Sequence, residues 1–210
     1  AVAERIIYGA LETMEKKSSS INILQSAISN IQSMGISSAY YRFQNNKKAE
    51  KTYSKMRKNE ADIVGQTFAF NPLITIVMPT FNTPTLFLTE AIQSIQSQTY
   101  KNWELCIADG STNNPEVRTL LKQYMKKDSR IKVTFLSKNN GISENTNQAL
   151  ALCNGEYIAL MDHDDVLHKD ALYYCVYHLN QDHSIDVIYT DEDKMSADSS
   201  KYYYPHFKPG

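Results

Sequence analysis

This 210-residue chain contains few cysteines and has almost no net charge. Its three cysteines, an odd number, lie in apolar segments and lack the spacing of a metal site: Cys106, Cys153 and Cys175. They favour buried free thiols in a reducing compartment over disulfides. Lysine and arginine together number 22, against 23 aspartates and glutamates. Net charge therefore does not indicate broad nucleic-acid binding, and we expect no nucleic-acid partner.

Long apolar runs are also missing. No segment is long enough to cross a bilayer, and no apolar core of a signal peptide follows Ala1. We therefore expect a cytoplasmic location. The basic side chains of residues 42–58 fit a solvated helix face, with attraction to anionic lipid or acidic glycan as the alternative. Peripheral association with the inner face of the membrane thus stays open.

The glycine-rich phosphate-binding motifs are absent as well. No Gly-x-Gly-x-x-Gly follows the first predicted strand, and no Walker-type lysine loop occurs. Both absences argue against dinucleotide binding and P-loop phosphate binding. If this chain holds a phosphate group, it must do so in another way, and a metal ion that bridges carboxylates to a diphosphate is the obvious one.

Two regions of different character make up the chain. Residues 3–34 carry apolar faces at helical spacing, and the composition changes near Asn71. We predict a helical N-terminal region over residues 1–70 and an α/β domain over residues 71–210. In the second region amphipathic helices alternate with five strand candidates: residues 73–78, 103–108, 131–136, 157–161 and 186–189. This alternation predicts a parallel sheet with helices on both faces. Three side chains are expected to cap helices: Thr83, Asn114 and Ser143.

An acidic cluster follows the apolar residues 157–161 directly and contains Asp162, Asp164 and Asp165. A short, continuous apolar run predicts a strand buried on both faces. Three carboxylates this close repel one another and stay charged only beside a counterion, for which a hard divalent cation is suited. The alternative is a helix cap followed by a solvated loop. The position of the cluster favours a ligand-binding site, because ligands bind outside the carboxyl ends of strands in open α/β sheets.

The other strand ends are expected to meet this cluster at one edge of the sheet. They are residues 80–82, Asp109, residues 139–141 and residues 191–193. Asp109 could accept the N3–H of uracil or thymine, which cytosine lacks, and a buried acceptor left unpaired by the wrong base is costly. The alternative role for Asp109 is a turn with Gly110 and Ser111.

Four segments resemble, in order, the successive motifs of family 2 glycosyltransferases: ITIVMPTFN at residues 74–82, WELCIADGS at 103–111, NGISENTN at 140–147 and GEYIALMDHDD at 155–165. Two later segments are similar to a branch that makes bacterial cell-surface polysaccharides: YTDEDK at 189–194 and PHFKP at 205–209. The resemblance covers about residues 71–208. It implies a GT-A fold (a Rossmann-like, mostly parallel sheet), a divalent metal, Mn²⁺ or Mg²⁺, and transfer with inversion at the sugar carbon.

The resemblance also implies a set of site residues. The nucleotide-sugar would be bound by Pro79, Thr80, Phe81, Asn82, Asp109, Asn139, Gly141, Asn147, Asp162 and Asp164, and the metal by Asp162, Asp164 and Asp165. Within this set, Asp109 matches the acidic residue that binds the nucleobase of the donor. Two departures concern the diphosphate contacts: Ala108 stands where many relatives have an acid, and Thr146 where many have an arginine.

We therefore expect a metal-dependent, inverting glycosyltransferase that moves a sugar from a UDP- or dTDP-sugar to a cell-surface glycan or a lipid-linked glycan. Inversion needs a general base, for which Asp191 and Asp193 are candidates, with a solvated turn as the alternative. In the family the base usually lies further along, and we expect the domain to continue past Gly210. The alternative function is a catalytically weak nucleotide-sugar-binding module that lacks its acceptor half.

Overall fold

The computed structural model describes residues 65–111, 113–195, 202–206 and 208. They belong to two compact units, Ile63–Ile188 and a second that includes Tyr189–Gly210. The helices predicted in residues 3–34 and the basic segment of residues 42–58 lie outside the described residues, so the domain boundary at residue 70 stays a prediction. Within the described residues, none of the helices combines the length and the apolarity that crossing a membrane requires.

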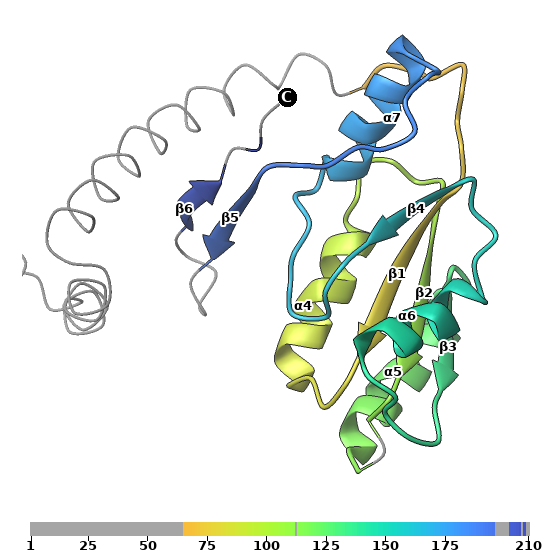
Figure 1. The fold of residues 1–210 in the computed structure, drawn as a ribbon, viewed down its shortest axis with the longest axis vertical. Helices are drawn as coiled ribbons and strands as arrows, with labels where there is room; N and C mark the ends of the chain where they lie inside the picture. Colours follow the sequence, from red (N-terminus) through yellow and green to blue (C-terminus); the bar gives the residue numbers. More distant parts are fainter. Residues whose placement is uncertain (1–64, 112, 196–201, 207, 209–210) are drawn as a thin grey trace, which may run out of the picture. The chain divides into compact units, whose positions relative to one another are not determined.

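A four-stranded parallel sheet forms the centre of the first unit (Figure 1). In the spatial order β3-β2-β1-β4, it contains β1 (Ile74–Thr80), β2 (Trp103–Asp109), β3 (Ile131–Phe135) and β4 (Tyr157–Leu160). The helices of this unit are α4 (Thr85–Gln96), α5 (Pro115–Lys127), α6 (Ile142–Leu150) and α7 (Ala171–Gln181). A helix joins each strand to the next, as parallel pairing requires. The predicted α/β class with a parallel sheet is confirmed.

Helices cover both faces of the sheet, as predicted. On one face, α4, α5 and α7 bury a large apolar cluster against alternate strand residues such as Ile76 and Ile107. On the other face, α6 packs Ala149 against Val77 and Ala108. Because successive side chains of a strand point to opposite faces and both faces are covered, β1 and β2 are buried at nearly every position, and their middle residues are apolar. All three cysteines are free thiols, as predicted, but only Cys106 is buried, whereas Cys153 and Cys175 are partly exposed.

Strand β4 departs from the prediction that residues 157–161 are buried on both faces. Ile158 is 45% exposed and Leu160 is 73% exposed, while Tyr157 and Met161 face the apolar cluster. β4 is an edge strand, and α6 packs mainly on β1 and β2, so one side of β4 is left open. The apolar run therefore predicted the strand correctly, but it wrongly predicted that both faces of the strand are buried.

The fifth strand predicted at residues 186–189 is wrong. These residues form no strand, and both Val187 and Tyr189 are exposed. In the second unit, β5 (Glu192–Met195) pairs antiparallel with β6 (Tyr202–His206). Strand-prone composition does not specify a strand by itself, because the backbone needs a neighbour for its hydrogen bonds.

Of the three predicted helix caps, one is confirmed. Asn114 caps α5 by accepting a backbone N–H with its side chain. Thr83 makes no cap hydrogen bond to α4 and is buried instead. α6 begins directly after Gly141, whose φ of 89° is a conformation that glycine adopts without a steric penalty. Ser143 therefore lies inside the helix and is not its cap.

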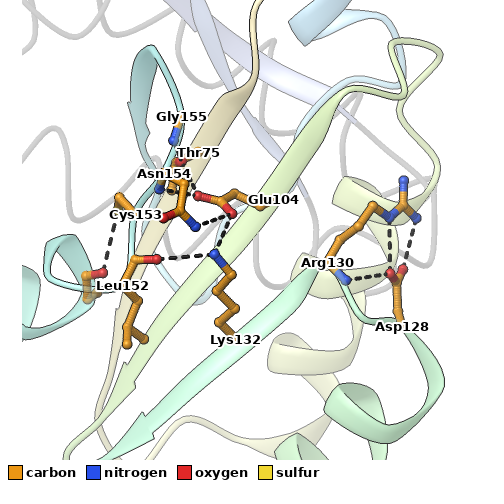
Figure 2. A network of polar contacts seen from close by, with 10 residues as sticks. Thr75, Glu104, Asp128, Arg130, Lys132, Leu152, Cys153, Asn154 and Gly155 are labelled. Atoms are coloured by element: carbon orange, nitrogen blue, oxygen red, sulfur yellow. Dashed lines mark hydrogen bonds and ion pairs between the residues drawn. The ribbon is translucent and has the colours of Figure 1, made fainter.

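An ion pair between a buried glutamate and a partly exposed lysine joins the amino-terminal ends of the strands (Figure 2). Glu104 on β2, whose side chain is 7% exposed, pairs with Lys132 on β3 at 2.6 Å between Oε2 and Nζ. Glu104 Oε1 also accepts hydrogen bonds from Thr75 Oγ1 on β1 and from the N–H of Asn154, both at 2.6 Å. Thr75 Oγ1 in turn accepts from the N–H of Gly155 at 2.9 Å, where any side chain would collide with Thr75. The network thus ties three strands to the turn that leads into β4.

We expect the free energy of unfolding to depend on pH through Glu104. Burial opposes its ionisation, but hydrogen bonds from Lys132, Thr75 and Asn154 outweigh burial and lower the pKa of Glu104 from 4.5 to about 2. Because the pKa is lower in the folded chain, the stabilisation is complete above the unfolded value and is lost as the pH falls from there toward the folded one. Urea unfolding from about pH 7 to about pH 3 should therefore show a steeper loss in the wild type than in Glu104→Gln. Equal pH dependence in the two proteins would contradict the expectation.

Candidate functional site

The carboxyl ends of the strands lie level at one edge of the sheet. Thr80 of β1 pairs with Asp109 of β2, which pairs with Phe135 of β3. The N–H of Gly110 donates to Thr80 O at 2.9 Å, and the N–H of Leu136 donates to Asp109 O at 2.8 Å. β4 runs beside β1 in the same direction. The loops that follow the four strands therefore open on the same edge, as the sequence predicted for them.

Asp109 is fully buried at this edge, and its two carboxylate oxygens differ in their surroundings. Oδ1 accepts from Thr80 Oγ1 at 3.1 Å and from the N–H of Ser111 at 3.0 Å. Oδ2 is shielded from water, has no hydrogen-bond partner within the described residues, and lies 3.8 Å from Nε of Arg118. One oxygen thus serves the turn, while the other keeps an unused acceptor position. A buried acceptor without a donor costs about 1–3 kcal/mol, which an N–H of a ligand could recover.

The loop after β1 is fastened to the loop after β2. The N–H of Asn82 donates to Ser111 Oγ at 2.7 Å, and Asn82 has a φ of 51°. Asparagine tolerates this left-handed conformation better than most residues do. Pro79 is half-buried in β1, and Phe81 is exposed next to Asn82. The pinned loop therefore presents an aromatic ring at the edge where Asp109 lies.

The loop after β3 is held by asparagine side chains. Asn139 Oδ1 accepts from the N–H of Gly141 at 3.0 Å and from Asn145 Nδ2 at 2.8 Å. Asn145 Oδ1 accepts from the N–H of Asn140 at 3.3 Å. A side chain at Gly110 would come within 3.0 Å of Asn145 Nδ2, so this loop packs closely on the loop after β2. The predicted site residues Asn139 and Gly141 therefore belong to the same edge as Asp109.

Asn145 is not among the residues predicted to bind the nucleotide-sugar, whereas Asn147 is. Asn145 is buried, whereas Asn147 is exposed on α6. The helical period contains the signal, because Asn145 precedes the buried Ala149 by one turn and shares its face. Asn147 points elsewhere, and its predicted role in binding stays a prediction.

Arg118 was missed as well. It lies in the first turn of α5, and its guanidinium donates from Nε to Ser111 O at 3.2 Å and from Nη2 to Leu136 O at 2.8 Å. The guanidinium carbon lies 5.4 Å from the centre of the Phe135 ring. Helical spacing marks the apolar face of α5. It does not mark a polar side chain that reaches sideways to two loops, so no sequence signal singles out Arg118.

The acidic cluster follows β4 in a turn, with Asp162, Asp164 and Asp165 all exposed. The N–H of Asp165 donates to Asp162 O at 3.3 Å, and His163 Nδ1 lies 3.8 Å from Asp164 Oδ1. Across the described part of the chain, no three His, Cys, Asp or Glu side chains are gathered into a ready-made metal cluster. The donors nevertheless fit Mn²⁺ or Mg²⁺. Such ions are often held by one or two carboxylates together with the phosphates of a substrate, without an all-protein cage.

The two base candidates, Asp191 and Asp193, belong to the second unit. Asp191 Oδ1 accepts from the N–H of Lys208 at 2.8 Å, and Lys208 Nζ lies 3.3 Å from Glu192 Oε2. Asp193 is half-buried in β5. One oxygen of Asp191 is thus engaged within its own unit, and the role of either residue as a base stays a prediction.

Several known proteins are similar to this chain. The profile of a family described as "Glycosyl transferase family 2" matches residues 75–207. The uncharacterized protein y4gI of Sinorhizobium fredii is 41% identical over 138 residues, which are 66% of this chain and 15% of that protein. The O-antigen biosynthesis protein RfbC of Myxococcus xanthus is 30% identical over 138 residues, 66% of this chain and 11% of that protein. The crystal structure of Staphylococcus aureus TarS 1–349 in complex with UDP is 24% identical, with a TM-score of 0.48, and the match covers 52% of this chain and 32% of that one. This chain spans less than a sixth of the length of the two sequence relatives.

Proposed function

Because this chain belongs to glycosyl transferase family 2, we propose that it binds a UDP- or dTDP-sugar at the carboxyl edge of its sheet and transfers the sugar to a glycan acceptor. One observation carries the proposal: Asp109 is fully buried at this edge, and its Oδ2 accepts no hydrogen bond from the described residues, with the Arg118 guanidinium 3.8 Å away. A ligand that places an N–H against this oxygen removes the penalty of the unpaired acceptor. Uracil and thymine have such a group at N3.

Base recognition in this proposal depends on Asp109 and its neighbours. Cytosine has a lone pair at N3, which would face the Asp109 carboxylate without a hydrogen bond and leave both acceptors unsatisfied. Because Oδ2 is shielded from water, a base reaches it only if the side chains above it shift. Phe81 is exposed nearby and offers an aromatic ring against which the flat base can pack.

The order of the strands suits a nucleotide that lies across the edge. Asp109 ends β2, and Asp162 follows β4, with β1 between them. Neighbouring strands are about 4.8 Å apart, so the two acids are separated by roughly 10 Å across the sheet. A nucleoside needs a span of this order between its base edge and its diphosphate. In this proposal the loop of residues 80–82 lines the nucleoside, as the resemblance implies.

The diphosphate end is the part of the proposal that involves a metal. Asp162, Asp164 and Asp165 are the residues that would hold Mn²⁺ or Mg²⁺. When bound, the cation supplies positive charge against the diphosphate as it leaves. The turn of residues 162–165 follows β4 directly and keeps its three carboxylates exposed. They can therefore contact a ligand without the unfolding of any helix or strand.

Transfer with inversion requires a base on the side of the sugar opposite the diphosphate. The base takes the proton of the acceptor hydroxyl while the oxygen attacks the sugar carbon, and the diphosphate leaves with the bonding electron pair. We assign Asp191 or Asp193 to this step as candidates. The name of RfbC, an O-antigen biosynthesis protein, supports a cell-surface polysaccharide or its lipid-linked precursor as the acceptor.

The proposal predicts that this chain prefers UDP to CDP and that Asp109 is responsible. Asp109→Ala should reduce the difference in binding free energy between the two nucleotides by about 1–3 kcal/mol, because the unpaired acceptor that discriminates is gone. Isothermal titration calorimetry with UDP and CDP in Mn²⁺ measures this difference directly. Asp109→Asn keeps the side-chain shape and serves as the milder variant if Asp109→Ala lowers the thermal stability.

Glu116→Gln is the matched control for this experiment. It removes one exposed carboxylate from the first turn of α5. Its preference for UDP should equal that of the wild type. If Asp109→Ala retained the full preference for uracil, Asp109 would be a turn residue only and the proposed base contact would be wrong.

A further inference from the structure

Arg118 is placed where a cation is disfavoured unless something compensates for it. It lies in the first turn of α5, at the end of the helix where the macrodipole is positive. Its side chain is 34% exposed, so the guanidinium is partly withdrawn from water. The compensation comes from Ser111 O and Leu136 O, which accept its hydrogen bonds, and from Asp109 Oδ2 at 3.8 Å.

One of the two carbonyls that Arg118 contacts lies in the loop after β2, and the other lies in the loop after β3. Ser111 follows β2 and uses its own N–H to hold Asp109 Oδ1. Leu136 follows β3 and donates its N–H to Asp109 O. The planar guanidinium therefore clamps both loops that frame this carboxylate, and it rests against the ring of Phe135 while doing so.

We propose that Arg118 is a positioning residue for base recognition, because it holds the Asp109 carboxylate and its two flanking loops in the arrangement that presents Oδ2 to a base. This inference rests on the proposed function, in which Oδ2 meets N3–H. Nε and Nη2 of Arg118 are already committed to main-chain carbonyls, so its role does not require contact with the nucleotide. Without Arg118 the loops lose their common clamp, and the carboxylate can turn toward water instead of keeping Oδ2 as a buried acceptor that lacks a hydrogen bond.

The test compares the preference for UDP over CDP in two variants of Arg118. Arg118→Gln removes the charge and the clamp. It should lower the ratio of the dissociation constant for CDP to that for UDP by roughly fivefold or more, the equivalent of one lost hydrogen bond. Arg118→Lys keeps the charge but cannot bridge two carbonyls with a planar fork, so it should restore only part of the ratio. The response of UDP affinity to Mn²⁺ should be the same in both variants as in the wild type, because the acidic turn is untouched.

Lys122→Gln is the matched control, because Lys122 lies one turn further along α5 and also approaches the Phe135 ring, at 5.7 Å. It removes a cation from the same helix face without removing the clamp, and the UDP to CDP ratio should not change. Thermal unfolding of all variants identifies any general loss of structure. A ratio that falls in Lys122→Gln as far as in Arg118→Gln would overturn the inference.

A double variant separates positioning from a general structural effect. If Arg118 acts through Asp109, then adding Arg118→Gln to Asp109→Ala should cause no further loss of the preference for UDP. If Asp109→Ala loses the preference and Arg118→Gln keeps it, the inference about Arg118 is wrong and the proposed function stands. If Asp109→Ala keeps the preference, the proposed base contact and the inference both fail.

Discussion

Removing divalent metal is expected to lower the affinity of this chain for UDP by roughly 100-fold, about 2.8 kcal/mol. The diphosphate and the carboxylates of Asp162, Asp164 and Asp165 carry charges of the same sign. Two unit charges 4 Å apart near a protein surface interact with about 4 kcal/mol, so the loss of a bridging cation turns attraction into repulsion of that order. Calorimetric titration of UDP in Mn²⁺ and in EDTA measures the effect. Asp164→Asn should remove most of the difference between the two conditions.

Asp182→Asn is the control for this experiment. Asp182 is an exposed carboxylate after the last turn of α7, where it accepts hydrogen bonds from Ser184. Its substitution changes the net charge by the same amount as Asp164→Asn, but it should leave the response to metal intact. Equal affinity of the wild type for UDP with and without Mn²⁺ would show that the acidic turn does not act through a metal.

Glu104→Ala should destabilise the chain by about 3 kcal/mol, because it removes a buried carboxylate that three groups share as their acceptor. These groups are Lys132, which keeps a hydrogen bond to Leu152 O, Thr75 Oγ1 and the N–H of Asn154. This network lies at the amino-terminal ends of the strands, opposite the edge that contains Asp109. Urea unfolding at neutral pH gives the loss in free energy. The molecules that remain folded should keep the wild-type preference for UDP over CDP.

The ion pair between Asp128 and Arg130 offers the matched control. Arg130 is 37% exposed and donates to both oxygens of Asp128 (Figure 2). The two cations are similarly exposed, but Asp128→Asn keeps an oxygen acceptor and the side-chain shape, so it should cost no more than about 1 kcal/mol. A similar loss of stability in Asp128→Asn and Glu104→Ala would show that the contacts of Glu104 with Thr75 and Asn154 add nothing to its ion pair.

Much of the fold and part of the site could be predicted from local patterns. The first four strands and their helices follow from runs of apolar residues and from helical spacing, which depend only on residues near one another in the chain. Because parallel strands share an edge, the same patterns brought Thr80, Asp109 and the acidic turn to one edge before any coordinates were known. Local patterns also gave the predictions that failed, which are the covering of β4, the strand at residues 186–189 and the helix caps Thr83 and Ser143.

By itself, the sequence determined the order and type of the elements and the chemical nature of the residues at the strand ends. Only the tertiary structure decided which oxygen of Asp109 lacks a hydrogen bond among the described residues, which arginine clamps the loops beside it, and which asparagine holds the loop after β3. These outcomes depend on contacts between residues far apart in the chain, such as Arg118 with Leu136 and Thr75 with Gly155. A pattern of nearby residues contains no information about such contacts, because they form only when the strands take their places side by side in the sheet.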